Sequence, residues 1–258
     1  MKLLCTISLL LLLSLLTTRS QAQSPQPASP EKSRKFFVGL SLGPSFPTGK
    51  FAGKNYQDTT AGLAQPGPAL AISGGYMFTR SIGAVLLVGG QINKTDAGAI
   101  ASGIAQRNGD TVRTEASAHN WKSARLMGGM VFKLPLTPSG KLSFQARILA
   151  GALKTSVPGY SYSMSLPAYG NFPYETGTKG DVSLNWAFCY QATTGLSWKL
   201  SKRISLVGDI SYYHADTKHH YDHYLHFSPG GTFYDSGPWD LKYSISSVNL
   251  SAGAEISF

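Results

Sequence analysis

Histidines gather in one stretch near the end of the chain, where five of the six lie between residues 214 and 226. His219 and His223 are four residues apart, so a helical turn would bring both imidazoles to one face. Imidazole at such a spacing suits Zn or Cu. No complete zinc-ligand motif is present, so a polar surface loop rich in His is the alternative. The candidate metal ligands are His214, His219, His220, His223 and His226.

Four charged residues stand out because they interrupt segments made mostly of apolar and small residues. Arg147 and Asp209 each lie six residues from a predicted short turn, so they can pair across a sheet. Opposite charges that are buried together satisfy one another, because an unpaired buried charge is costly. This group suits either structural ion pairing or the lining of a narrow, gated pore. The four residues are Arg125, Arg147, Asp209 and Glu255.

The last eleven residues, 248–258, indicate how such charges are positioned. Apolar residues alternate with polar or small ones, and Glu255 lies on the polar side. A period of two predicts a strand and not a helix. Eleven residues match the length that a tilted strand needs to cross a bilayer. The apolar face consists of Val248, Leu250, Ala252, Ala254, Ile256 and Phe258.

The same alternation recurs along the chain and predicts eight strands in all. Short turns and long polar segments connect them in strict alternation, with the long ones at 47–67, 94–118, 154–181 and 215–238. Residues 239–245 alternate in the opposite sense to 248–258, so we expect a β-bulge near Ser246 and Ser247. The predicted strands are 37–46, 68–78, 82–93, 119–134, 141–153, 182–200, 203–214 and 239–258.

The polarity of the two strand faces separates a membrane barrel from a soluble one. A soluble barrel is apolar inside, whereas here the side that carries Arg147 and Asp209 is polar and the aromatic residues lie on the other. Trp186 and Trp198 are spaced to reach the two membrane interfaces. We therefore predict an all-β fold: an eight-stranded antiparallel up-and-down transmembrane β-barrel with short periplasmic turns and four long extracellular loops.

Composition agrees with this class. The chain has 258 residues, of which 42% are hydrophobic and 14% charged. Its mean hydropathy of -0.07 is too low for a bundle of transmembrane helices. The net charge of +10 comes without a basic run or an RNA-binding motif, which argues against nucleic acid as a partner. Scattered basic residues favour contact with outer-membrane lipid, including anionic lipopolysaccharide.

The N-terminal residues read as a targeting segment. Lys2 precedes a short apolar run, and small residues follow at 20–22, so we predict a signal peptide at 1–22. Residues 23–35 are rich in Pro, Ser and charge and are expected to form a disordered periplasmic tail. The barrel then occupies 36–258.

On this topology and on the terminal Phe258, residues 36–258 resemble the OmpA-like, OmpX-like and opacity-protein-like eight-stranded barrels of the bacterial outer membrane. The resemblance implies a location in that membrane and a monomeric state. It also implies that Phe258, behind alternating apolar residues, is part of the signal read by the barrel-insertion machinery.

The expected function is a structural or surface-recognition role without enzymatic activity or cofactor, directed at an extracellular ligand that the sequence does not name. A small-solute, porin-like channel is the alternative, although eight strands leave an interior filled by side chains. A hydrolase that modifies lipid A is the third reading, because residues 226–228 resemble the His-x-Ser motif of such barrels. Pro229 stands where that family has Asn, and the nearest acid, Glu255, lies far along another strand, so no third group orients the base.

Overall fold

The computed structural model describes residues 35–108, 113–165, 174–177, 186–221, 225–227, 233–235 and 239–258, within a compact unit that begins at Arg34. The predicted signal peptide and all but the last residue of the predicted tail lie outside the described residues, so these two segments stay predictions. No helix in the described parts of the chain is long and apolar enough to cross a membrane.

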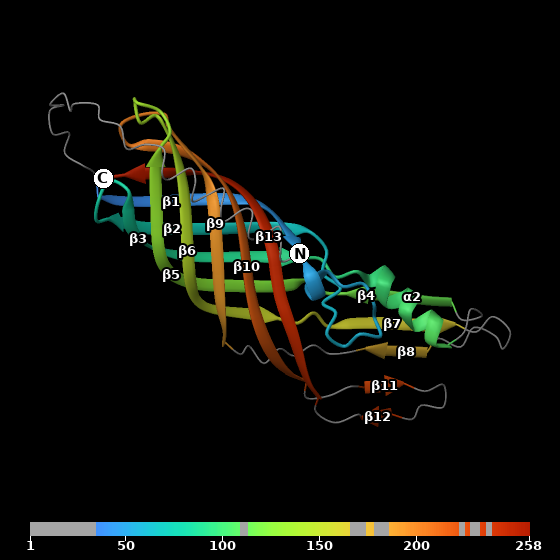
Figure 1. Cartoon of the computed structure of the whole chain (residues 1–258). Helices are drawn as coiled ribbons and strands as arrows, with labels where there is room; N and C mark the ends of the chain where they lie inside the picture. Colours follow the sequence, from blue (N-terminus) through green and yellow to red (C-terminus); the bar gives the residue numbers. More distant parts are fainter. Residues whose placement is uncertain are drawn as a thin grey trace, which may run out of the picture. The chain divides into compact units, whose positions relative to one another are not determined.

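Eight long strands form a closed antiparallel barrel, as predicted (Figure 1). Each strand pairs with the barrel strand next to it along the chain, and the last pairs with the first, so no edge is left open. In barrel order the strands are β1 (Phe36–Pro47), β13 (Trp239–Ser257), β10 (Ile204–Tyr221), β9 (Trp186–Lys199), β6 (Leu142–Ser156), β5 (Trp121–Pro135), β3 (Ile82–Asn93) and β2 (Gly67–Met77).

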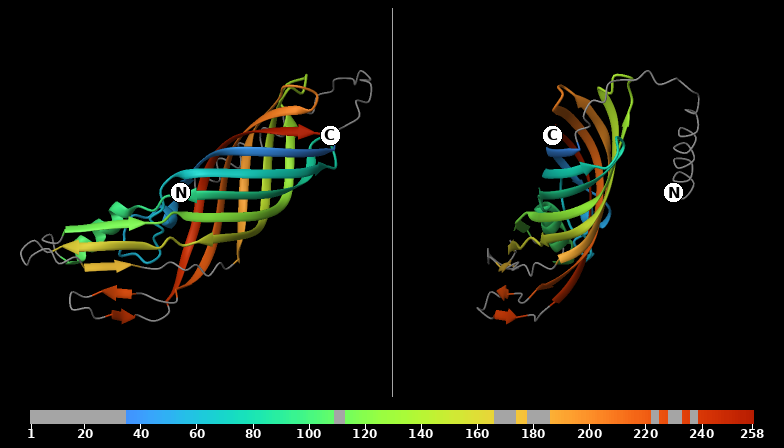
Figure 2. Two further views of the ribbon diagram at one scale, coloured as in Figure 1. Left: turned by 180° about the vertical axis from the view of Figure 1, so that it is seen from behind. Right: turned by 90° about the vertical axis from the view of Figure 1, so that its left-hand side faces the viewer.

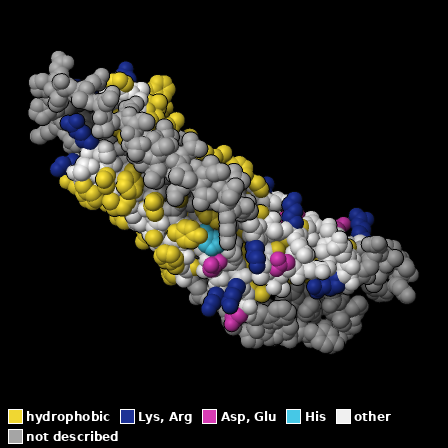
Figure 3. Space-filling view, viewed as in Figure 1, with side chains coloured by type: hydrophobic (Ala, Val, Ile, Leu, Met, Phe, Trp, Pro, Cys, Tyr) yellow, Lys and Arg dark blue, Asp and Glu magenta, His cyan; other side chains and the backbone are white. Residues whose placement is uncertain are grey.

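The outer face of the barrel is apolar, whereas the inner face mixes polar and charged side chains with apolar ones. Leu86, Ile148 and Phe188 are at least 66% exposed on the outside, whereas inward neighbours such as Leu87, Leu149 and Cys189 are buried. Figure 3 shows apolar side chains gathered over the barrel strands and charged ones beyond them. This arrangement suits a hydrocarbon surrounding and not water, so the chain forms an outer-membrane barrel. Trp186 and Trp198, near opposite ends of β9, both face outward.

The predicted bulge near Ser246 and Ser247 is wrong. β10 and β13 pair without interruption from Ile204↔Ile256 to Tyr221↔Trp239, and both serines lie within this ladder. The reversal of pattern has another cause: beyond the bilayer, the outer face meets water. Outward positions there carry Asp216 and Lys218, and the apolar side chains turn inward.

The four long connections contain regular structure instead of plain loops (Figure 2). A 3-10 helix, η1 (Gly49–Ala52), follows β1, and an α-helix, α2 (Ala97–Asn108), follows β3. The other segments pair into a second antiparallel sheet in the order β12-β11-β8-β7-β4. We call this sheet the extracellular sheet. Its strands are β4 (Arg113–Ala118), β7 (Tyr160–Ser165), β8 (Tyr174–Gly177), β11 (Leu225–Phe227) and β12 (Phe233–Asp235).

One face of the extracellular sheet is covered by α2. Ile100 and Ile104 of α2 are 1% and 4% exposed and form one hydrophobic cluster with Leu63. Alternate residues of β4 and β7 complete it, including Tyr160, whose hydroxyl lies 2.8 Å from that of Tyr56. Tyr160 and Tyr162, in a segment expected to be a long loop, thus pack within the protein.

Candidate functional site

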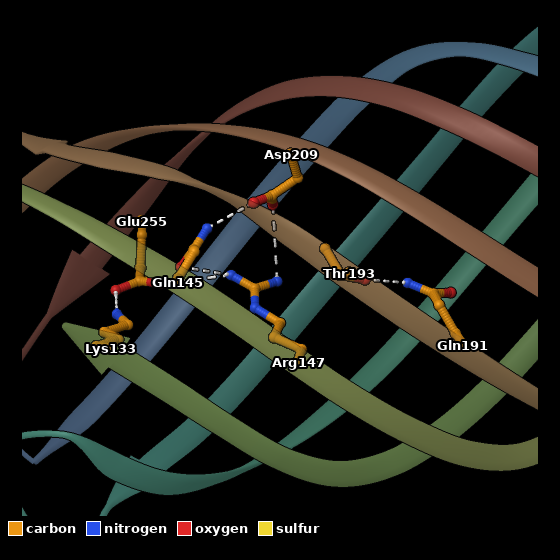
Figure 4. Close-up of polar contacts among 7 residues, drawn as sticks. All are labelled: Lys133, Gln145, Arg147, Gln191, Thr193, Asp209 and Glu255. Carbon is orange, nitrogen blue, oxygen red and sulfur yellow. Dashed lines mark hydrogen bonds and ion pairs between the residues drawn. The ribbon is translucent and has the colours of Figure 1, made fainter. Parts of the chain in front are cut away.

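The inner faces of β5, β6, β10 and β13 bring four charged side chains together near the short-turn end of the barrel (Figure 4). Arg147 lies between two carboxylates: its Nη1 is 4.0 Å from Asp209 Oδ2 and its Nη2 is 3.8 Å from Glu255 Oε2. Lys133 Nζ pairs with Glu255 Oε1. Two cations therefore face two anions, as the cost of burying charge requires.

Gln145 joins the two halves of this network. Its Nε2 donates to Asp209 Oδ1 at 2.6 Å, and its Oε1 accepts from Arg147 Nη2 at 3.3 Å. All three side chains are buried. We call Lys133, Gln145, Arg147, Asp209 and Glu255 the lumen network.

Arg125 lies apart from the lumen network although its side chain is also buried. Its Nη1 donates to Gln91 Oε1 at 3.4 Å, and its guanidinium carbon lies 4.8 Å from the centre of the Tyr213 ring. Gln91 also binds Asn93 and Ser45. Among the described residues, Arg125 forms no ion pair with a carboxylate.

The space left between Arg125 and the lumen network is small. One polar cavity of about 30 Å³ is lined by residues of both groups. This is room for a water molecule or two, because one water needs about 10–15 Å³ of such space. The interior of the barrel is thus filled by side chains, as expected for eight strands.

An aromatic cluster closes the lumen at the end that bears the extracellular sheet. Phe51 of η1 packs edge-on against Trp121 at 5.3 Å, and Trp121 packs against Tyr243 at 5.2 Å. Trp121 Nε1 donates to the backbone oxygen of Gly62 at 2.8 Å. Phe51 and Trp121 are 1% and 2% exposed. We call Phe51, Trp121 and Tyr243 the aromatic stopper; no pattern in the sequence predicted it.

The two described histidine side chains of the candidate metal group lie on opposite faces of β10. His214 faces outward, and its Nε2 is 3.5 Å from Asp216 Oδ1. His219 faces inward, is 2% exposed and lies 2.9 Å from Thr217 Oγ1. It lies beyond Tyr212, the last apolar residue on the lipid-facing side of β10, and burial there lowers its pKa from 6.5 to about 4.

The expected helical alignment of His219 with His223 is wrong, because β10 is a continuous strand through His219 and His220 to Tyr221. His223 lies outside the described residues, as do the side chains of His220 and His226. Within the described part of the chain, no three His, Cys, Asp or Glu side chains form a metal-binding group. A metal site in this segment stays a prediction.

The His-x-Ser fragment and its candidate acid lie at opposite ends of β10. Glu255 pairs with Ser205 at the start of this strand and binds Lys133, whereas His226 belongs to β11, which follows its far end. Ser228 lies outside the described residues. A hydrolytic triad that uses Glu255 is therefore not assembled by this topology.

Lys133 is the functional side chain that sequence reasoning missed in the lumen. It follows Arg125 and Val131 on the inward side of β5, in the same alternation of faces. A Lys close to a strand end is ordinarily expected in solvent. Its Nζ instead lies over the Phe37 ring at 4.6 Å as well as against Glu255. Assigning alternate residues to the inward side as far as the end of β5 would have placed Lys133 in the lumen.

No family model and no curated protein matches the chain. Among solved structures, Neisserial surface protein A is 11% identical, with a TM-score of 0.45 over 86% of this chain and 97% of that one. A major outer membrane protein from Thermus thermophilus is 14% identical, with a TM-score of 0.41 over 88% and 100%. Ail of Yersinia pestis is 10% identical, with a TM-score of 0.36 over 87% and 97%. At these TM-scores the likenesses add nothing on function, and the fold rests on the strand pairing of the chain itself.

Proposed function

We propose that this protein is a non-enzymatic outer-membrane protein that binds an extracellular ligand through the extracellular sheet. The observation that carries the proposal is the contrast between the two parts of the molecule. The cavity between Arg125 and the lumen network measures about 30 Å³, and aromatic side chains pack across the outer end of the lumen. The long connections, by contrast, form a second sheet outside the barrel. A filled lumen favours a structural role for the barrel over a channel.

The face of the extracellular sheet away from α2 is the proposed contact surface. It carries Arg113 and Glu115, whose side chains are 77% and 71% exposed and form an ion pair at 3.3 Å. Ser117 and Ser161 lie beside them and share a hydrogen bond of 2.8 Å. A polar surface on paired strands offers many hydrogen-bonding groups at a low cost in conformational entropy. We call Arg113, Glu115, Ser117, Ser161 and Ser163 the open polar face.

A binding screen of the folded full-length chain in detergent tests this proposal. The probes are extracellular-matrix proteins and glycans on an array, with Arg113→Ala/Glu115→Ala and Ser163→Trp as variants that alter the open polar face. Arg80→Ala, in the exposed turn between β2 and β3, is the matched control. We expect the first two to lose binding at least tenfold and the control to keep it. Binding that all three variants share would contradict the proposal, as would stable conductance steps in planar bilayers.

Contact with lipopolysaccharide is a second proposal, supported by cations at the edge of the apolar belt. Lys122 and Lys154 face outward on the neighbouring strands β5 and β6. Lys154 Nζ lies 5.9 Å from the centre of the outward Trp186 ring, and Trp side chains favour the depth of the lipid headgroups. Anionic headgroups would meet both ammonium groups there.

Co-purification of lipopolysaccharide with the folded protein tests this second proposal. Lys122→Gln/Lys154→Gln should reduce the amount that remains bound, because two cations at headgroup depth are removed. Lys202→Gln, in the short turn at the opposite end of the barrel, is the control. Equal amounts with all variants would reject the proposal.

A further inference from the structure

The charges inside the barrel do not balance. Lys133, Arg147 and Arg125 are buried or half-buried cations, and the described lumen carries two carboxylates, Asp209 and Glu255. The lumen network is neutral by itself, so the excess positive charge lies at Arg125. The ring of Tyr213 stabilises a cation, but it supplies no counter-charge. A buried cation without an anion is strongly disfavoured.

Three N–H donors without a hydrogen-bond partner line the polar cavity between Arg125 and the lumen network. Arg125 Nε, Arg147 Nε and Asn249 Nδ2 are buried and have no hydrogen-bond partner among the described residues. All three side chains line the same polar cavity and are less than 7% exposed. Buried N–H groups are almost always satisfied, so three unsatisfied donors around one cavity indicate a bound acceptor, which is either water or an anion. The unbalanced charge of Arg125 favours the anion.

We propose that this cavity is a binding site for one small monovalent anion of the chloride class. The excess charge of the described lumen is a single positive one, which a monovalent anion neutralises and a divalent one would overshoot. A volume of about 30 Å³ admits a halide and is too small for phosphate or sulfate. Asp209 also lines the cavity, but its two oxygens are engaged by Gln145 and Arg147.

Two carbonyl oxygens along the cavity define the rest of the site. Gln191 Oε1 and Asn249 Oδ1 are buried without a partner among the described residues, and both would repel an anion in direct contact. Gln191 Nε2 donates to Thr193 Oγ1 at 3.0 Å, so its oxygen faces away from that bond (Figure 4). We assign the anion to the side of the cavity nearest the Arg125 and Arg147 Nε atoms, with a water bridging to these oxygens.

Crystals of the full-length protein grown with bromide in place of chloride test the site without any variant. We expect an anomalous difference peak within hydrogen-bonding distance of Arg125 Nε and Arg147 Nε. Ordered water at that place, with no anomalous signal, would overturn the proposal.

The dependence of stability on chloride provides the second test. Equilibrium unfolding in urea, followed by the folded band on unboiled SDS gels, is measured as chloride replaces gluconate at constant ionic strength. Once chloride exceeds its dissociation constant, each further tenfold increase should raise the folded-to-unfolded ratio about tenfold. Arg125→Gln should abolish this dependence, and Arg80→Gln in the exposed turn should preserve it. A parent protein indifferent to chloride, or an Arg125→Gln variant with the parent's dependence, would contradict the proposal.

Discussion

The guanidinium of Arg147 lies 4.0 Å from the carboxylate of Asp209, across the barrel interior from β6 to β10. Together with Gln145, this pair ties the two strands through side chains alone, because β9 lies between them in the sheet. The interaction therefore holds β6 and β10 together without any backbone hydrogen bond between these two strands.

Removal of either partner should destabilise the barrel. Arg147→Ala leaves the buried Asp209 without its ion-pair partner, at a cost of about 3 kcal/mol. Asp209→Ala leaves Arg147 paired with Glu255 alone, so it should cost less. The double change Arg147→Met/Asp209→Leu should cost less than the two single changes together, because no orphaned charge remains. Thermal midpoints of the folded band on SDS gels measure this, with Arg80→Ala as the control. Strict additivity would show that the pair is not coupled.

The protein should not conduct in planar bilayers, and removal of the aromatic stopper alone should not change that. Phe51→Ala/Trp121→Ala opens only the outer end, and the lumen network still fills the barrel below it. Conductance should require the stopper and the Arg147–Asp209 pair to be altered together. Single-channel steps from the unaltered protein would reject the closed lumen and restore the channel alternative.

Acid should destabilise the outer end of the barrel through His219. Burial lowers its pKa to about 4, while the unfolded side chain titrates near 6.5. Between these values the unfolded state binds more protons, so stability falls as pH drops through this range, by on the order of 3 kcal/mol in total. The free energy of unfolding should be lower at pH 4.5 than at pH 7.5 in the parent and in His214→Gln. In His219→Gln the difference between the two pH values should be smaller. An equal acid response in all three proteins would contradict this assignment.

Deletion of Phe258 should impair insertion far more than Ser257→Ala. The Phe258 N–H donates to the Phe36 oxygen at 2.9 Å, where the last strand meets the first, and its ring is 63% exposed on the outside. Ser257 is less exposed and lies on the inward side. Fractionation of cells that express each variant measures the inserted share. Equal insertion would reject a role of Phe258 as a signal for the insertion machinery.

Zinc titration should be insensitive to His219→Ala, because that imidazole is buried against Thr217 and faces away from His214. Any heat of binding should then depend on the other histidines of 214–226. Calorimetry at pH 7.5 and 5.5 measures it, since imidazole binds metal only when neutral. Loss of the heat in His219→Ala alone would show that this side chain turns outward to bind metal.

The barrel could be predicted from the sequence because its surroundings impose a strict rule. Lipid on one side and a tightly packed lumen on the other force a period of two, so strands such as Ile82–Asn93 were predicted with the bounds observed. The four lumen charges were located by the same parity. Their partners were only partly predictable, because the choice among carboxylates depends on barrel closure and strand tilt.

The alternation of lipid-facing and inward residues does not hold beyond the membrane surface, and the wrong predictions concern residues there. The outer half of β13 reads as a reversed pattern because Tyr243 and Ile245 pack inward where water replaces lipid. Strands of three to six residues, such as β11 and β4, are too short to show a clear period. Phe51 lies alone in a polar stretch, and only its contact with Trp121 reveals its role.

The uninterrupted pairing of β10 with β13 has a mechanical consequence. A load on a ligand held by the extracellular sheet would run along these two strands into the bilayer. Because both strands enter the connection between them at the same end, at Tyr221 and Trp239, such a pull draws β10 and β13 in one direction. It shears their ladders with β9 and β1, so many hydrogen bonds are loaded at once instead of one by one. The hairpin of β10 and β13 should therefore move as one stiff unit under such a load.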